Sequence, residues 1–169
     1  MKTSLWFIIL TISIGFSLQA QNVNKKIMDA EHEQEILIGI CNRDGLQEGD
    51  FGNYFKEEYE AYEADQVMIN NIYNLDKNTD ITIVLGTWCH DSQEQVPRFY
   101  RIMDEAKIAD DVISVICVDG NKTGGELDIE RLGIELVPTF IFYRKGEELG
   151  RIIETPEVSL EADMWEIIK

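Results

Sequence analysis

The sequence predicts an α/β fold in which a mixed sheet is flanked by helices and preceded by a helical N-terminal extension. From residue 81 onward, short β-branched apolar runs alternate with amphipathic segments, which is typical of strand–helix–strand units with a parallel strand pair. Two further apolar runs are joined by Arg144-Lys145-Gly146-Glu147, which predicts an antiparallel hairpin at the sheet edge. With 44% hydrophobic residues, a chain of 169 residues has enough apolar material for the core of one ordinary domain.

The first twenty residues have the layout of an export signal. Lys2 precedes an apolar run over residues 5–18, and Ala20 precedes a polar stretch. We expect residues 1–20 to be a signal peptide and the mature chain to be exported, periplasmic or extracellular, in a compartment that permits disulfides. The alternative is an uncleaved anchor, although the run is shorter than the ~20 residues that a spanning helix needs. After cleavage we expect no stable membrane insertion.

Residues 21–78 are interpreted as a helical extension. The polar segment 22–35 predicts a loose or helical leader, and an apolar run at 36–40 ends in a turn at 42–45. Aromatic side chains then recur at helical spacing, and a weaker second helix is expected over 65–75. The aromatic positions are Phe51, Tyr54, Phe55, Tyr59 and Tyr62. We expect this stripe to pack on the main core, with a docking face for a partner as the alternative.

Residues 79–169 are expected to form the main domain. The run Ile81–Leu85 is too apolar to be half exposed and predicts a buried central strand. Its neighbour along the chain, 92–106, predicts a helix with one apolar side. Further strands are expected at 112–118, 139–143 and 149–153, and a short helix at 129–132. A last helix is expected to begin at Thr155-Pro156-Glu157, because proline suits the first helical position.

Trp88-Cys89-His90-Asp91-Ser92 lies where the central strand meets the next helix. A thiol at a helix N-terminus faces unpaired backbone N–H groups and the positive end of the helix dipole. Both favour the thiolate, which is the nucleophilic form of cysteine. A protonated His90 would act in the same direction, whereas Asp91 opposes it. Cys89 is therefore the candidate nucleophile, and the alternative is an inert, partly buried cysteine.

With these residues the chain resembles the thioredoxin-like superfamily over about residues 79–169. Trp88 and Cys89 match the family's Trp-Cys-x-x-Cys motif, Pro97 its helix-kinking proline, and Lys145-Gly146-Glu147 its hairpin turn. Val137-Pro138-Thr139 matches its cis-proline signature. The resemblance implies a thioredoxin-like three-layer sandwich, in the layout of secreted bacterial members with an added N-terminal segment. It also implies a groove for an extended peptide beside the thiol. The residues that would shape this groove are Trp88, Val137, Pro138 and Thr139.

Two positions depart from the family pattern. Ser92 stands in the place of the second cysteine, and Ile83 in the place of a buried acid. A serine can hydrogen-bond the thiolate, but it cannot resolve a mixed disulfide. The sequence therefore predicts a monothiol thiol–disulfide exchange protein, an oxidoreductase or isomerase, with Cys89, Ser92 and His90 as its catalytic residues. Its expected partners are protein or small-molecule thiols and disulfides. The alternative is a catalytically silent module that binds peptides or proteins in the groove.

The remaining candidate residues are interpreted as structural. Cys117 lies in an apolar strand and is expected in the core, while Cys41 could approach Cys89 only if their Cα atoms lie within about 7 Å. Asp119–Glu130 matches a calcium loop only in part, and His32 is most simply an exposed helical residue. No zinc spacing or nucleotide-binding loop is present, so we expect no metal and no cofactor. A net charge of −17 argues against nucleic-acid partners.

Overall fold

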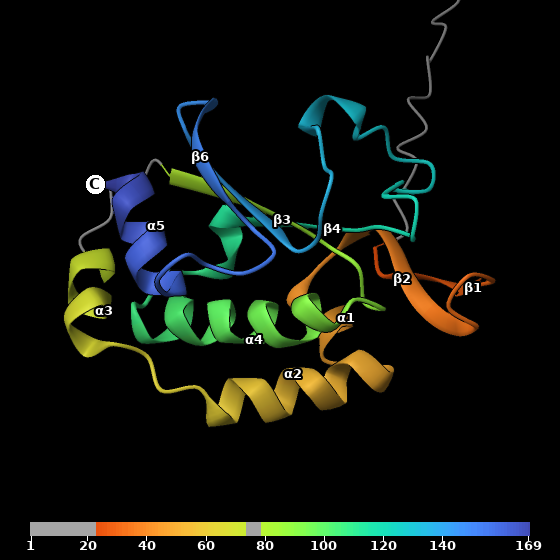
Figure 1. Ribbon diagram of the computed structural model, residues 1–169, viewed down its shortest axis with the longest axis horizontal. Helices are drawn as coiled ribbons and strands as arrows, with labels where there is room; N and C mark the ends of the chain where they lie inside the picture. The colour runs from red at the N-terminus through yellow and green to blue at the C-terminus, as the bar shows by residue number, and fades with distance from the viewer. Residues whose placement is uncertain (1–22, 74–78) are drawn as a thin grey trace, which may run out of the picture.

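The structure is a computed structural model that describes residues 23–73 and 79–169. The predicted signal peptide, residues 1–20, lies outside this part of the chain. The described residues contain a six-stranded sheet with the strand order β1-β2-β4-β3-β5-β6 (Figure 1). The strands are β1 (Lys25–Asp29), β2 (Gln34–Cys41), β3 (Thr79–Leu85), β4 (Ile113–Cys117), β5 (Thr139–Arg144) and β6 (Glu147–Ile153).

The strand β3 is the buried central strand that the sequence predicts. It pairs in parallel with β4 on one side, with Ile81 opposite Ile113, and antiparallel with β5 on the other side. The helix α4 (His90–Glu105) connects β3 to β4 and so forms the crossover of the parallel pair. The strands β5 and β6 form an antiparallel hairpin at one edge of the sheet, which confirms the prediction for this pair.

The N-terminal extension begins with a β-hairpin, so the prediction of a loose or helical leader is wrong. β1 pairs antiparallel with β2, and β2 pairs antiparallel with β4, so the extension continues the sheet of the main domain. The sequence of the leader does not show a strand pattern because β1 lies at the sheet edge and most of its side chains are exposed. Met28, for example, is 73% exposed. The two helices expected after the leader are present as α2 (Gly49–Ala61) and α3 (Gln66–Tyr73), whereas the turn expected at 42–45 is a short helix, α1 (Arg43–Leu46).

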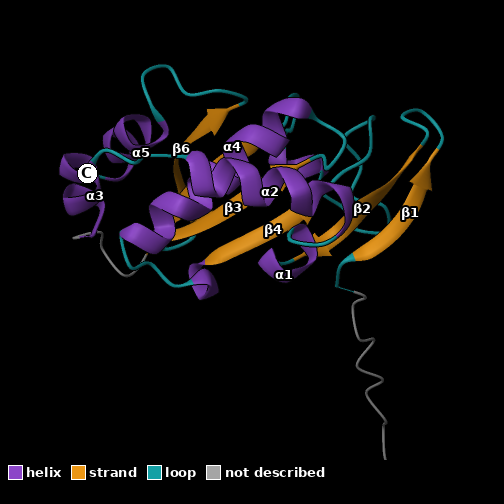
Figure 2. Cartoon of the chain, turned by 90° about the horizontal axis from the view of Figure 1, so that it is seen from below, coloured by secondary structure: helices purple, strands orange, loops and turns teal. Residues whose placement is uncertain are grey.

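The main core lies between the sheet and the helices α2 and α4, which run side by side across one face (Figure 2). Phe99 of α4 stacks on Phe140 of β5 with 4.8 Å between the ring centroids, and both side chains are fully buried. In the aromatic stripe of α2, Phe51 and Phe55 are buried in this core, and only Tyr54 is as much as 45% exposed. The stripe is therefore mainly a packing surface, as predicted.

The opposite face of the sheet carries a smaller apolar cluster. Val84 of β3 and Val118, which follows β4, lie in it together with Val137. Partly buried side chains from residues 127–134 pack against this cluster, and the one helical turn of that segment is η2 (Glu130–Leu132). Trp88 and Cys89, two of the candidate site residues, also pack against this smaller cluster.

The last helix begins later than the sequence predicts. The helix α5 spans Leu160–Ile168, and its N-cap is Ser159, whose hydroxyl accepts a hydrogen bond from the N–H group of Ala162. The preceding residues are held in a turn because the carboxylate of Asp163 accepts hydrogen bonds from the N–H groups of Glu157 and Val158. A side-chain cap therefore decides the helix start here, rather than the proline at 156.

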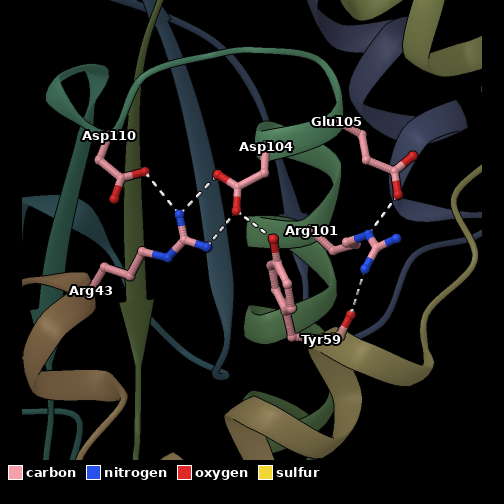
Figure 3. Close-up of polar contacts among 6 residues, drawn as sticks. All are labelled: Arg43, Tyr59, Arg101, Asp104, Glu105 and Asp110. Carbon is pink, nitrogen blue, oxygen red and sulfur yellow. Dashed lines mark hydrogen bonds and ion pairs between the residues drawn. The ribbon is translucent and has the colours of Figure 1, made fainter.

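Arg43 fastens the extension to α4 (Figure 3). Its guanidinium donates two hydrogen bonds to Asp104, at 2.9 and 2.5 Å, and lies 3.5 Å from Asp110. The guanidinium also lies 4.8 Å from the ring centre of Tyr100. Tyr59 of α2 donates a 2.6 Å hydrogen bond to the same Asp104 carboxylate. Burial raises the pKa of Asp104, but the hydrogen bonds from Arg43 and Tyr59 outweigh it and lower that pKa. One polar network thus joins α1, α2 and α4.

Candidate functional site

Cys89 lies at the junction between β3 and α4. It is the N-cap residue of α4, with an extended backbone (φ −86°, ψ 128°), and its side chain is half-buried. The N–H group of Cys89 donates a 2.9 Å hydrogen bond to the carbonyl of Gly86, which closes the turn between the strand and the helix. The thiol therefore lies at the N-terminal end of a long helix, where unpaired backbone N–H groups favour a negative charge.

The thiol of Cys89 contacts the loop that precedes β5. Its Sγ donates a hydrogen bond to the carbonyl oxygen of Val137, 3.2 Å away. The Val137–Pro138 peptide bond is cis. This loop is held by two further hydrogen bonds of 2.7 Å, one from the Thr139 hydroxyl to the carbonyl of Leu136 and one from the N–H group of Glu154 to the carbonyl of Pro138. Because the side chains of residues 137–139 are buried, the loop presents its main chain to the thiol.

Ser92 and His90, the other two residues predicted to be catalytic, make different contacts. Ser92 is fully buried, and its hydroxyl oxygen accepts a hydrogen bond from the N–H group of Gly86 at 3.3 Å. The hydrogen bond of the Cys89 thiol goes to Val137 rather than to Ser92. His90 is the first residue of α4 and is exposed. A role of either side chain in stabilising the thiolate therefore stays a prediction.

Trp88 is held by contacts from several elements. Its indole Nε1–H donates a 3.0 Å hydrogen bond to the carbonyl of Val118. The indole lies so close to Gly86 that a Cβ added at that glycine would fall 2.5 Å from the ring. The Nζ atom of Lys122 lies 5.8 Å from the ring centre. His32 stacks on the indole, with 4.4 Å between the ring centroids and 17° between the ring planes.

The position of His32 shows that its interpretation as an exposed helical residue is wrong. It lies in the turn between β1 and β2, and its side chain is 25% exposed. Its Nδ1 atom lies 2.5 Å from Oδ2 of Asp29, and this hydrogen bond lowers the pKa of the Asp29 carboxyl. The contact with Trp88 joins segments that are far apart along the chain, so no local pattern in the sequence indicates it.

The other two cysteines lie in the main core, on the opposite face of the sheet from Cys89. Cys117 is fully buried and Cys41 is 5% exposed, and they occupy the neighbouring strands β4 and β2. Cys89 instead packs against the smaller cluster around Val84. Burial, together with the adjacent thiol of Cys41, raises the pKa of Cys117. Cys41 thus neighbours Cys117 and not Cys89, so the alternative in which Cys41 pairs with Cys89 is not supported.

The acidic loop after β4 is held by its own hydrogen bonds. The carboxylate of Asp119 accepts hydrogen bonds from the N–H groups of Asn121 and Thr123 and from the Thr123 hydroxyl. Within residues 23–73 and 79–169, no three His, Cys, Asp or Glu side chains are grouped so that they could hold a metal ion. The same stretches contain no helix that is both long and apolar enough to cross a membrane.

No protein-family model matches the sequence, and no curated protein matches it. Among solved structures, a protein of unknown function from Pseudomonas aeruginosa is similar at 14% identity and a TM-score of 0.50, over 68% of this chain and 70% of that one. An HIV epitope scaffold is similar at 14% identity and a TM-score of 0.51, over 67% and 69%. A thioredoxin from Arabidopsis thaliana in its oxidised state matches at 18% identity and a TM-score of 0.41, over 64% and 96%.

At these levels of identity, the comparisons describe the fold alone. The parallel pair joined through α4 and the antiparallel hairpin at the sheet edge are those that the order of strands and helices in the sequence predicts. The chain therefore has a thioredoxin-like α/β fold. Function has to be argued from the site itself, because one fold can carry many activities.

Proposed function

We propose that the chain is an exported, monothiol thiol–disulfide exchange protein that acts through Cys89. The observation that carries this proposal is the distribution of the three cysteines. Cys89 alone is partly exposed, at a helix N-terminus and in contact with the main chain of the loop before β5, whereas Cys41 and Cys117 are buried. Accessibility and thiolate stabilisation together make a cysteine reactive. The signal-like layout of residues 1–20 supports export to an oxidising compartment.

In the proposed reaction, the Cys89 thiolate attacks one sulfur of a substrate disulfide. The substrate S–S bond breaks, a new S–S bond forms between Cys89 and that sulfur, and the other sulfur leaves as a thiolate that takes up a proton. Ser92 supplies no second thiol, so a thiol from outside the chain attacks the mixed disulfide in the reverse sense and releases Cys89. The protein thus exchanges disulfides and keeps no disulfide of its own at the site.

The loop before β5 would position the substrate in this reaction. In the resting protein the carbonyl of Val137 accepts the hydrogen bond of the Cys89 thiol. When Cys89 loses its proton, this hydrogen bond is lost and the carbonyl is free for another donor. An extended substrate chain can then donate a backbone N–H group to Val137 beside the reacting sulfur. The Val137 carbonyl would therefore accept from the thiol in the free protein and from the substrate chain in the complex.

The same hydrogen bond favours a second candidate function, a binding module without turnover. The thiol of Cys89 already has a hydrogen-bond partner within the chain, the carbonyl of Val137. In this alternative, the surface beside Trp88 and Val137 would hold a peptide while Cys89 stays an ordinary thiol. The two functions differ in the reactivity of Cys89, which can be measured directly.

The test is the second-order rate at which each cysteine forms a mixed disulfide with glutathione disulfide, followed by intact mass and peptide mapping. We expect wild-type protein and the Cys41→Ala control to gain one glutathione, located on Cys89, faster than free cysteine does at the same pH. The Cys89→Ser variant should gain none and keep its thermal unfolding midpoint. A Cys89 that reacts no faster than free cysteine would favour the binding module, and unchanged labelling of Cys89→Ser would refute the assignment of the nucleophile.

A further inference from the structure

We propose that His32 is a positioning residue for the exchange reaction of Cys89. His32 stacks on Trp88 and is hydrogen-bonded to Asp29. These contacts restrict the turn that holds the Cys89 thiol beside the carbonyl of Val137. This inference rests on the proposed function, and it adds a residue from the β1–β2 hairpin to a site otherwise formed by β3, α4 and the loop before β5.

The hairpin holds the imidazole of His32 in one orientation. The hydrogen bond between Nδ1 and the Asp29 carboxylate is short, at 2.5 Å, and the Asp29 side chain is only 13% exposed. Asp29 also accepts a 3.2 Å hydrogen bond from the N–H group of Glu31, which ties the carboxylate to the same turn. Because the carboxylate fixes both the position and the plane of the ring, His32 meets Trp88 as a preorganised surface.

The loop after β4 leaves room for this arrangement at Gly120. A Cβ added at this glycine would fall 3.0 Å from the Cε1 atom of His32 and 2.3 Å from a carboxylate oxygen of Glu31. The tip of the hairpin and the loop after β4 therefore approach closely beside Trp88. Lys122, from the same loop, lies near the indole and completes its surroundings.

Trp88 directly precedes Cys89, so a restraint on the position of the indole also restrains the backbone that holds the thiol. Both residues pack against the smaller apolar cluster, and the turn that contains them is closed by the hydrogen bond from Cys89 to Gly86. The indole N–H group donates a hydrogen bond to the carbonyl of Val118, and His32 stacks on the face of the ring. Without His32, the indole and the turn gain freedom, and Cys89 spends less time in the geometry that reacts.

The test compares His32→Ala, which removes the ring, with His32→Phe, which keeps a flat ring on the indole but loses the bond to Asp29. Met28→Ala serves as the matched control, because Met28 is an exposed residue of the same hairpin. The readouts are the rate of mixed-disulfide formation at Cys89 with glutathione disulfide and the NMR signal of the Trp88 indole N–H group, assigned by its loss in Trp88→Phe.

We expect His32→Ala to slow the reaction about three- to tenfold, the range that corresponds to one aromatic stacking contact. It should also shift the indole signal, while His32→Phe restores most of the rate and Met28→Ala changes neither readout. The inference is overturned if folded His32→Ala reacts at the wild-type rate, or if His32→Phe restores the indole signal but not the rate. If wild-type Cys89 forms no mixed disulfide, the proposed function itself fails, which is a different result from a normal wild-type rate with no effect of His32.

Discussion

Replacement of Arg43 by alanine should destabilise the fold without touching the candidate site. The guanidinium of Arg43 makes two hydrogen bonds to Asp104 (Figure 3). It also lies 4.8 Å from the ring centre of Tyr100. With alanine at this position, α1 loses its link to α4, and the Asp104 carboxylate keeps only the hydrogen bond from Tyr59. The network is partly exposed and adjoins the main core through Tyr59 and Tyr100, whereas Cys89 packs against the other cluster.

The magnitude follows from the partial burial of the pair. The Arg43 side chain is 19% exposed and that of Asp104 is 34% exposed, so the pair is worth more than the ~0.2–1 kcal/mol of a fully exposed ion pair. The contact between the guanidinium and Tyr100 adds about 0.5–1 kcal/mol. We expect a loss of about 2 kcal/mol, or roughly 4–8 °C in the unfolding midpoint for a chain of this size.

The assay is urea unfolding followed by circular dichroism, with a double-mutant cycle that pairs Arg43→Ala with Asp104→Asn. Arg43→Lys is the control that keeps the charge but loses the two parallel hydrogen bonds and the planar stacking, so it should recover only part of the stability. The reaction rate of Cys89 should be unchanged in all four variants. A loss below about 0.5 kcal/mol in Arg43→Ala, or a cycle with no coupling between the two positions, would refute this account of the network.

Three further predictions concern pH, a buried carboxylate and the missing second thiol. The pKa of Asp104 is lower in the folded than in the unfolded chain. Its stabilising contribution is therefore present above the unfolded pKa and is lost as pH falls through the folded pKa. The difference in unfolding free energy between wild type and Asp104→Asn should shrink from about pH 6 to about pH 3. Glu161 is 1% exposed and accepts hydrogen bonds from the Tyr62 hydroxyl and the Asp65 N–H group, so Glu161→Ala should cost about 1–3 kcal/mol in chemical denaturation. Glu161→Gln, which keeps an acceptor, should cost less, and equal losses would contradict this reasoning. Ser92→Cys should supply an internal resolving thiol, so that the glutathione adduct of Cys89 no longer accumulates. The chain should instead form an internal disulfide at the site and lose the mass of two hydrogen atoms. An adduct as abundant as in wild type would show that the introduced thiol cannot reach Cys89.

The elements around the candidate site could be predicted because their signals are local. β3 is buried on both faces, so its residues form a continuous apolar run, and α4 shows one apolar side in its sequence. β1 could not be predicted in this way, because an exposed edge strand needs no alternation of apolar and polar residues. The sequence offers two possible starts for α5, one at Pro156 and one at Ser159. The folded chain uses Ser159, because Asp163 holds the preceding residues in a turn by accepting a hydrogen bond from Glu157.

The same distinction applies to the candidate site, where some features depend on neighbouring residues in the sequence and others on residues far along the chain. The place of Cys89 at a strand–helix junction follows from its immediate neighbours in the sequence. The contact of its thiol with Val137 depends on how β5 lies beside β3, and the stacking of His32 on Trp88 depends on a hairpin whose strands were not predicted. The hydroxyl oxygen of Ser92 accepts a hydrogen bond from the N–H group of Gly86, a contact that the motif did not indicate, and the role of Ser92 beside the thiolate stays a prediction.

The arrangement of the cysteines sets how far the proposed reaction can proceed within one chain. Cys41 and Cys117 lie in the main core, while Cys89 packs on the other face of the sheet. An internal attack on a mixed disulfide at Cys89 would require one of these buried thiols to pass the central strand, which would mean unfolding the sheet. The lifetime of the mixed disulfide is therefore set by thiols outside the chain. If Cys89 reacts as proposed, the chain suits disulfide exchange or capture rather than rapid net reduction, because its own part in the reaction ends when the mixed disulfide has formed.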